Sequence, residues 1–227
     1  YLIVPYFKNS ELPVVFCGVN WDSDNSQQSG AEKYGYPFNN VTGMVEISLV
    51  DQAFETIREY ADGERVGVLV PDNISGRKEV QFYRVKLAQS LAQEIYAATF
   101  EQWKASYLQL QKEVDMLIIA SPNGIKGWND LEAKAFVEAN TRIPSSTFGL
   151  GGISYALIGF TKVPEELGEW SAQTALQILA GADPADIPIT TNHTAKIYLN
   201  MELASKLKIR FPIDLIERST FTSEVER

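Results

Sequence analysis

Four polar or glycine-rich segments follow short apolar runs in this sequence, and they are the first candidates for chemistry. They are NWD (20–22), PDNISGR (71–77), SPNG (121–124) and FGLGG (148–152). Carboxylate, amide, hydroxyl and backbone N–H groups bind small polar solutes, and an indole ring offers a flat face for stacking. The alternative is that these are ordinary turn residues, because Asn, Asp, Gly, Ser and Pro are common in any β-α loop.

The elements around these segments alternate between short apolar runs and longer amphipathic stretches. Strands are expected at 13–19, 65–70, 93–98, 115–121, 143–149, 155–160 and 195–200, and helices at 49–61, 77–92, 99–114, 127–141 and 164–181. Strands that alternate with helices of this length predict parallel β-α units, buried on both faces of the sheet. Ligands of open parallel sheets bind outside the carboxyl ends of the strands, so the polar segments are expected to converge on one crevice.

Composition excludes several classes of partner. The chain has 227 residues and a net charge of −9, which argues against binding to nucleic acid or to an anionic membrane. No apolar run reaches the ~20 residues of a membrane span, so we expect no direct membrane insertion of this segment. The single cysteine, Cys17, lies in an apolar run and is expected to be a small buried side chain.

Signatures of catalysis are missing from the sequence. It contains no GxxxxGK[ST], HExxH or CxxC motif, and its one histidine, His193, lies in a polar loop. Glu165 and Glu166 are either a catalytic pair or the start of a helix, where carboxylates are favoured by the helix dipole, and we favour the helix start. We therefore expect no catalytic residue, no metal site and no cofactor.

Five segments, in this order and spacing, carry a resemblance to a known family. They are NVTGMVE (40–46), GVLVPDN (67–73), TRIPSSTFG (141–149), ALQILAGADPADIPI (175–189) and IYLNMELASKLKIRFP (197–212). The sequence resembles the periplasmic substrate-binding components of ABC transporters, in the group that includes tryptophan- and tyrosine-binding members. The resemblance implies an α/β fold of the type I periplasmic-binding class, with two doubly wound parallel-sheet lobes joined by a hinge, which close on a ligand.

The resemblance also implies a division of the chain. An incomplete first lobe is expected at 1–45 and 149–195, and a second lobe at 46–148 and 196–227, with its C-terminal segment over the hinge. Family members carry further β-α units ahead of the position of Tyr1, so the N-terminal part of the first lobe is expected to be missing from this chain. Gly151 and Gly152 either let the hinge move or turn a corner.

The ligand-binding residues follow from the strand ends and the resemblance together. They are expected to be Asn20, Trp21, Asp22, Glu46, Asn73, Ser75, Gly76, Ser121, Asn123, Phe148 and Gly149. For an amino-acid ligand, its carboxylate would meet a helix start at Ser75–Gly76 and its ammonium group would meet Asp22. Trp21 and Phe148 would supply apolar walls. The structural alternatives are that Ser75 only caps its helix and that Asp22 only caps a turn.

The function implied is that of an exported solute-binding protein, periplasmic or lipid-anchored at the cell surface. It would bind a small polar solute such as an amino acid and deliver it to an ABC permease in the membrane. A solute-sensing module of a signalling protein is an alternative with the same fold. An α/β enzyme acting on a small carboxylate is a third, since a fold alone does not fix the chemistry.

Overall fold

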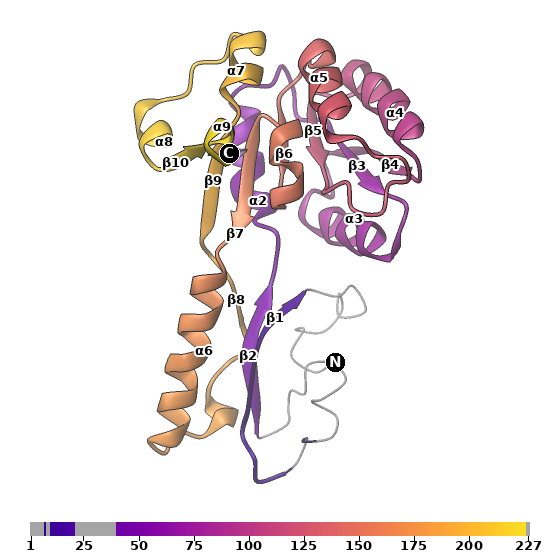
Figure 1. The fold of residues 1–227 in the computed structure, drawn as a ribbon. Coiled ribbons are helices and arrows are strands. Elements are labelled where there is room, and N and C mark those ends of the chain that lie inside the picture. Colours follow the sequence, from indigo (N-terminus) through magenta and orange to yellow (C-terminus); the bar gives the residue numbers. More distant parts are fainter. Residues whose placement is uncertain (1–6, 8–9, 21–39, 226–227) are drawn as a thin grey trace. The chain divides into compact units, whose positions relative to one another are not determined.

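The structure of the protein, a computed structural model, describes residues 7, 10–20 and 40–225 (Figure 1). Its internal contacts divide the chain into two units, and the chain passes from one unit to the other three times. Unit 1 ends its first stretch at Ile47 and also takes in Lys162–Thr194, whereas unit 2 consists of Ser48–Thr161 and Ala195–Arg227. Each unit has its own parallel sheet.

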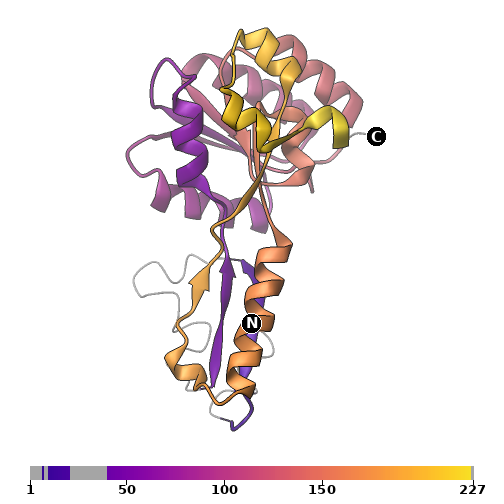
Figure 2. The same ribbon diagram turned by 90° about the vertical axis from the view of Figure 1, so that its left-hand side faces the viewer.

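The described residues of unit 1 form a three-stranded sheet with the order β1-β2-β8. Its elements are β1 (Val14–Asn20), β2 (Val41–Glu46), α6 (Pro164–Leu179), the short 3-10 helix η3 (Pro184–Asp186) and β8 (Thr190–Thr191). Helix α6 begins with a proline at its first position and packs along β1 and β2 (Figure 2). Strands β1 and β2 pair in parallel so that Asn20 lies beside Glu46, and both strands end at the same edge.

Strand β1 differs from the expectation that every strand is buried. Cys17, expected to be buried, is exposed. The pairing with β2 shifts register between Phe16 and Val19, and Gly18 between them has a positive φ of 65°. This irregularity turns the middle of β1 out of the regular pleat, and among the described strands β1 is the outer one of its sheet, so the side chain of Cys17 is exposed.

Unit 2 has a seven-stranded sheet with the order β10-β9-β7-β6-β5-β3-β4. Its strands are β3 (Val66–Pro71), β4 (Leu91–Ala97), β5 (Met116–Ile119), β6 (Ser145–Thr147), β7 (Ile158–Lys162), β9 (Ala195–Leu199) and β10 (Ser219–Phe221). Its helices are α2 (Val50–Arg58), α3 (Ile74–Lys86), α4 (Phe100–Glu113), α5 (Asp130–Asn140), η2 (Leu150–Tyr155), α7 (Met201–Leu207), α8 (Ile213–Glu217) and α9 (Thr222–Val225).

The direction in which the chain moves across this sheet places the helices on two faces. From β3 the chain moves outward to β4, and from β4 it returns past β3 to β5 and then to β6. Because such crossovers are right-handed, α3 lies on one face and α4 and α5 on the other. Contacts of α2 with α3, and of α4 with α5, agree with this doubly wound arrangement. Unit 2 is therefore the α/β fold that the sequence predicted.

The second passage between units falls later in the chain than we expected. Residues 149–161 were predicted in the first lobe, but β7 pairs in parallel with β6 in the sheet of unit 2. The passage lies after Thr161, not at Phe148–Gly149. The prediction was wrong because β7 is one more strand of the same sheet, and an apolar run does not reveal the sheet to which it belongs.

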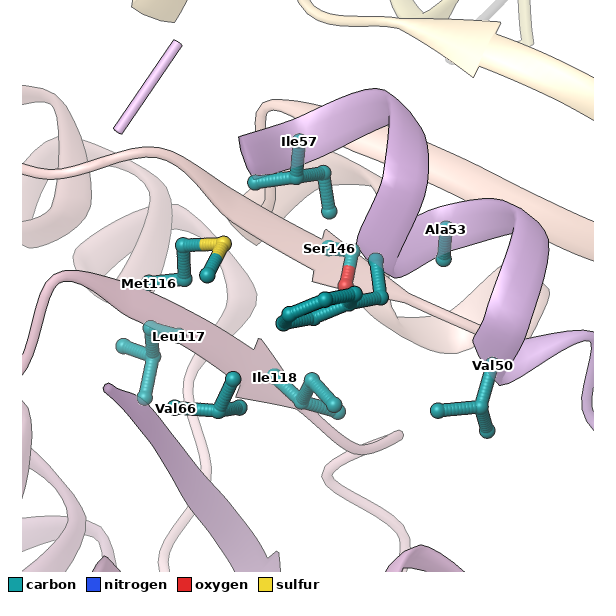
Figure 3. A pocket seen from close by; sticks show the side chains of 9 residues that line it. Val50, Ala53, Ile57, Val66, Met116, Leu117, Ile118 and Ser146 are labelled. Atoms are coloured by element: carbon teal, nitrogen blue, oxygen red, sulfur yellow. The ribbon is translucent and has the colours of Figure 1, made fainter. Parts of the chain in front are cut away.

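The core of unit 2 lies between the sheet and its helices. Leu69, Leu117, Trp103 and Tyr107 are almost completely buried. A cavity of about 10 Å³ lies between α2 and strands β3, β5 and β6, lined by apolar side chains and by Ser146 (Figure 3). This volume is at the lower limit for one water molecule, so the cavity is a packing feature and not a solute site.

Helix α4 shows how local sequence fixes an element of unit 2. The Thr99 side chain accepts a hydrogen bond from the backbone of Gln102, and the Gln102 side chain accepts one from the backbone of Thr99. This capping box satisfies two of the N–H groups that a helix start leaves unpaired. Within the described residues, no helix has the length and apolar character needed to cross a membrane.

Candidate functional site

Asn73 organises the carboxyl end of β3. Its side-chain oxygen accepts a hydrogen bond from the backbone N–H of Gly76 at 2.8 Å, which makes Asn73 the N-cap of α3. Its Nδ2 donates to the backbone oxygen of Asn123 at 3.0 Å, so it ties the loop after β3 to the loop after β5. Two segments that the sequence predicted to converge are therefore joined by one side chain.

The helix start expected at Ser75–Gly76 has a different structure. Helix α3 begins at Ile74, Asn73 is its cap instead of Ser75, and Ser75 is exposed in the first turn. The N–H of Gly76 is already bonded to Asn73, so it is not open to a ligand carboxylate. A Cβ at Gly76 would overlap the carbonyl oxygen of Pro71, which shows that this glycine serves close packing of helix on strand.

Two buried hydroxyl groups lie at the carboxyl ends of β5 and β6. Ser121 Oγ and Thr147 Oγ1 have no hydrogen-bond partner among the described residues. Helix η2 packs against both, because a Cβ at Gly151 would come within 2.5 Å of Ser121 Oγ and one at Gly152 would overlap Thr147 Oγ1. The two glycines thus permit close packing inside unit 2 and do not lie at a passage between units.

Large apolar side chains are exposed at the same edge of the sheet. Ile74, the first residue of α3, is 76% exposed, and Leu150, the first residue of η2, is 60% exposed. They follow β3 and β6, which flank β5 and its Ser121 in the sheet. The edge of unit 2 therefore combines polar and apolar surface, which is the composition of a site for an amphipathic small molecule.

Phe148 and Gly149 connect β6 to η2. Phe148 is only 8% exposed, and its ring lies 5.8 Å from that of Tyr83 in the core. This ring packs into the interior of unit 2 and does not form an exposed wall. Gly149 caps η2, where its carbonyl oxygen accepts from the N–H of Gly152 at 2.9 Å.

Trp128 and Tyr155 fix the loop after β5 to helix α5. The Trp128 Nε1–H donates to Asp130 Oδ1 at 2.9 Å, and the Tyr155 hydroxyl donates to the same oxygen at 2.5 Å. The hydrogen bond from Tyr155, followed by that from Trp128, lowers the pKa of Asp130 below its usual value. Trp128 also packs edge-on against Trp103, so its role is structural.

A charged cluster occupies the carboxyl ends of β1 and β2 in unit 1. The Lys162 ammonium group donates to Glu46 Oε1 at 2.6 Å and to Asn20 Oδ1 at 3.3 Å. Asn20 and Glu46 were predicted as site residues, and the structure brings them together. Lys162 was missed, although its position at the end of an apolar strand and just before a proline-initiated helix was a signal for it.

Two side chains of unit 1 bond the backbone near the points where the chain passes from one unit to the other. Asn192 is buried and bonds both the N–H and the carbonyl oxygen of Ile47, at 2.7 and 3.1 Å. The Glu166 carboxylate accepts from the backbone N–H groups of His193 and Thr194 at 2.8 and 2.9 Å. Glu166 thus does more than start its helix, since it fixes the segment by which the chain leaves unit 1.

A hollow of about 340 Å³ lies on the opposite edge of unit 2. It is lined from α2 and α8, with Glu55, Glu59 and Asp214 among its residues. These parts of α2 lie just before the amino end of β3, away from the strand ends where ligands of such sheets bind.

The predicted residues Trp21 and Asp22 lie outside the described residues.

The sequence itself matches a known family. Residues 4–222 match the profile of the ABC transporter substrate binding protein family. The chain belongs to this family. The substrate-binding proteins of ABC transporters act outside the cytoplasm, and members of the family bind a small-molecule solute for a membrane permease. None of the curated proteins with which the sequence was compared matches it.

Solved structures share the fold of this substrate-binding protein. A conserved domain protein from Vibrio cholerae has 19% identity and a TM-score of 0.59, over 92% of this chain and 71% of that one. An ABC domain in complex with L-Trp from Streptococcus pneumonia has 19% identity and a TM-score of 0.58, over 93% and 72%.

A third similar structure is the ligand-free, open form of a substrate binding protein with adhesive properties from Clostridium difficile. It has 18% identity and a TM-score of 0.62, over 81% of this chain and 62% of that one. At these identities the similarity establishes the fold, which is of the type I periplasmic-binding class, as the sequence predicted.

Proposed function

We propose that this substrate-binding protein binds an amino acid and delivers it to an ABC permease. The observation that carries the proposal is the match of residues 4–222 to the family of ABC transporter substrate-binding proteins. The protein of similar fold from Streptococcus pneumonia was solved with L-Trp, which supports an amino acid as the class of solute.

The residues at the edge of unit 2 support a solute with both polar and apolar groups. Asn123 is exposed and offers an amide group in the loop after β5, next to the buried hydroxyl of Ser121, which has no partner within the described part of the chain. Ile74 and Leu150 expose apolar surface that a solute would cover. Burying such surface contributes about 25 cal/mol per Å², so an apolar side chain on the solute would add affinity.

The test is a thermal-denaturation screen of the purified protein with each of the twenty L-amino acids and with D-glucose, D-ribose and D-galactose. A ligand that binds only the folded state raises the melting temperature according to its concentration and affinity. We expect one amino acid, or a few related ones, to raise it and the sugars to have no effect. A rise with a sugar and with no amino acid would refute the proposal.

A further inference from the structure

The Lys162–Glu46 ion pair has the properties of a binding site and not only of a structural contact. It lies where β1 and β2 end, which is the edge at which solutes bind in open parallel sheets. The two side chains are 26% and 21% exposed, so the pair is partly desolvated and is still accessible. Interactions with charged groups are stronger there than on an open surface.

The hydrogen-bonding capacity of the pair is not used up. An ammonium group has three N–H donors, and Lys162 uses two of them, for Glu46 and Asn20. Within the described part of the chain, the third donor has no partner. Glu46 accepts through Oε1, and its Oε2 likewise has no hydrogen bond to a described residue. Among the described residues, a donor of Lys162 and an acceptor of Glu46, of opposite charge, therefore remain unbonded in neighbouring side chains.

We propose that this pair recognises the head group of a free amino acid, with the solute's carboxylate on Lys162 and its ammonium group on Glu46. This inference rests on the proposed function and adds the residues that select the solute class. A zwitterion placed on an ion pair gives every charge an opposite neighbour, and the site stays neutral. A solute with only one charge would bind one member of the pair and bring its charge close to the other member, which has the same sign. This repulsion is uncompensated, so the site discriminates against such a solute.

The test compares L-tryptophan with 3-(indol-3-yl)propanoate, which lacks the ammonium group, and with tryptamine, which lacks the carboxylate. Isothermal titration calorimetry gives the dissociation constant of each compound. In Glu46→Gln we expect affinity for L-tryptophan to fall roughly ten- to hundredfold, as for the loss of a hydrogen bond to a charged group, and affinity for the propanoate to stay constant or rise. In Lys162→Met we expect a similar fall in affinity for L-tryptophan and no fall in affinity for tryptamine.

Two further variants serve as controls. Lys104 bonds Glu101 and Glu132 at 2.7 and 2.6 Å in unit 2, so Lys104→Met removes a comparable pair away from the site and should change no affinity. The double variant Glu46→Lys with Lys162→Glu keeps an ion pair but exchanges donor and acceptor. It should melt near the wild-type temperature and bind L-tryptophan at least roughly tenfold more weakly.

The outcomes separate this inference from the proposed function. If Glu46→Gln and Lys162→Met weaken all three compounds equally, the pair only stabilises unit 1, and the inference is wrong. If the wild-type protein binds an L-amino acid other than tryptophan, the test uses the two analogues of that amino acid, one without the ammonium group and one without the carboxylate. If it binds no amino acid at all, the proposed function fails together with this inference.

Discussion

Two neighbouring serines of β6 differ in the bonds that they make. Ser145 Oγ accepts a hydrogen bond from the N–H of Leu157 at 3.1 Å. Ser146 Oγ is buried in the apolar cavity beneath α2 and has no partner among the described residues. The same chemical change at the two positions should therefore have different effects on stability.

We expect Ser145→Ala to lower the free energy of unfolding by about 1–3 kcal/mol, because it leaves a buried N–H unpaired. Ser146→Ala removes a hydroxyl that lacks a partner, so we expect no loss of stability, or a small gain of up to about 1 kcal/mol. Urea denaturation followed by circular dichroism measures both. Equal losses in the two variants would show that Ser146 has a partner, such as a buried water molecule.

Asp130 gives unit 2 an acid-sensitive contact. Its pKa is lowered in the folded protein, first by the Tyr155 hydroxyl and then by the Trp128 indole. A carboxyl group with a lowered folded pKa stabilises the protein above its unfolded pKa, near 3.9, and this stabilisation is lost as the pH falls through the folded value. We expect the wild-type protein to lose stability in this range more steeply than Asp130→Asn.

Measuring the free energy of unfolding between about pH 5 and pH 2.5 checks this expectation, since the range spans the reference pKa of an aspartate. Tyr155→Phe removes the larger of the two causes and should give a pH dependence between those of the wild type and Asp130→Asn. Parallel curves for the three proteins would contradict the assignment of the pKa shift to these hydrogen bonds.

At the scale of elements, Asn73 has two roles that can be separated. Its side-chain oxygen caps α3, and its Nδ2 ties the loop after β3 to Asn123. Asn73→Ala loses both, and we expect it to lower the free energy of unfolding by about 1 kcal/mol for the cap and by about 1 kcal/mol for the tie. Asn73→Ser keeps a capping oxygen and should lose only the second amount.

A matched control is available in α5. Asn129 caps that helix by accepting from the N–H of Glu132 at 3.0 Å. Asn129→Ala should lose about 1 kcal/mol, the value of a cap alone. If Asn73→Ser is as destabilised as Asn73→Ala, the capping role assigned to the Asn73 side chain is wrong.

The elements of unit 2 were largely predictable from sequence, because buried parallel strands are continuous apolar runs and helices show a 3.6-residue period. Helix α4 with its Trp103–Tyr107 face is an example. Caps were less predictable, since both Asn73 and Ser75 are good N-caps and only the packing of α3 decides between them. The exposure of Cys17 depends on a bulge that no local pattern reveals.

The site was predictable only in part. Strand ends indicated Asn20, Asn73 and Ser121 correctly as residues at the carboxyl edges of sheets. Lys162 was not predicted because it is a single charged residue at the end of a strand and not part of a polar cluster in the sequence. Phe148 was assigned as a wall, but its ring direction depends on contacts with α3 that are distant in sequence.

Taken as a whole, the molecule is proposed to bind one amino acid per chain. The family supports solute binding, the edge of unit 2 exposes apolar side chains beside polar ones, and in unit 1 the Lys162–Glu46 pair keeps a donor and an acceptor that no described residue bonds. An amino acid with an apolar side chain carries groups suited to each of these features.

Native mass spectrometry tests this claim most directly. The purified protein is incubated with an equimolar mixture of the twenty L-amino acids, D-glucose, D-ribose and D-galactose, and the mass of the bound adduct distinguishes an amino acid from a sugar. We expect a single adduct per chain with the mass of an amino acid that has an apolar or aromatic side chain. An adduct with the mass of a sugar would contradict the proposed binding of an amino acid. So would the absence of any adduct at solute concentrations far above those at which transport proteins bind their solutes.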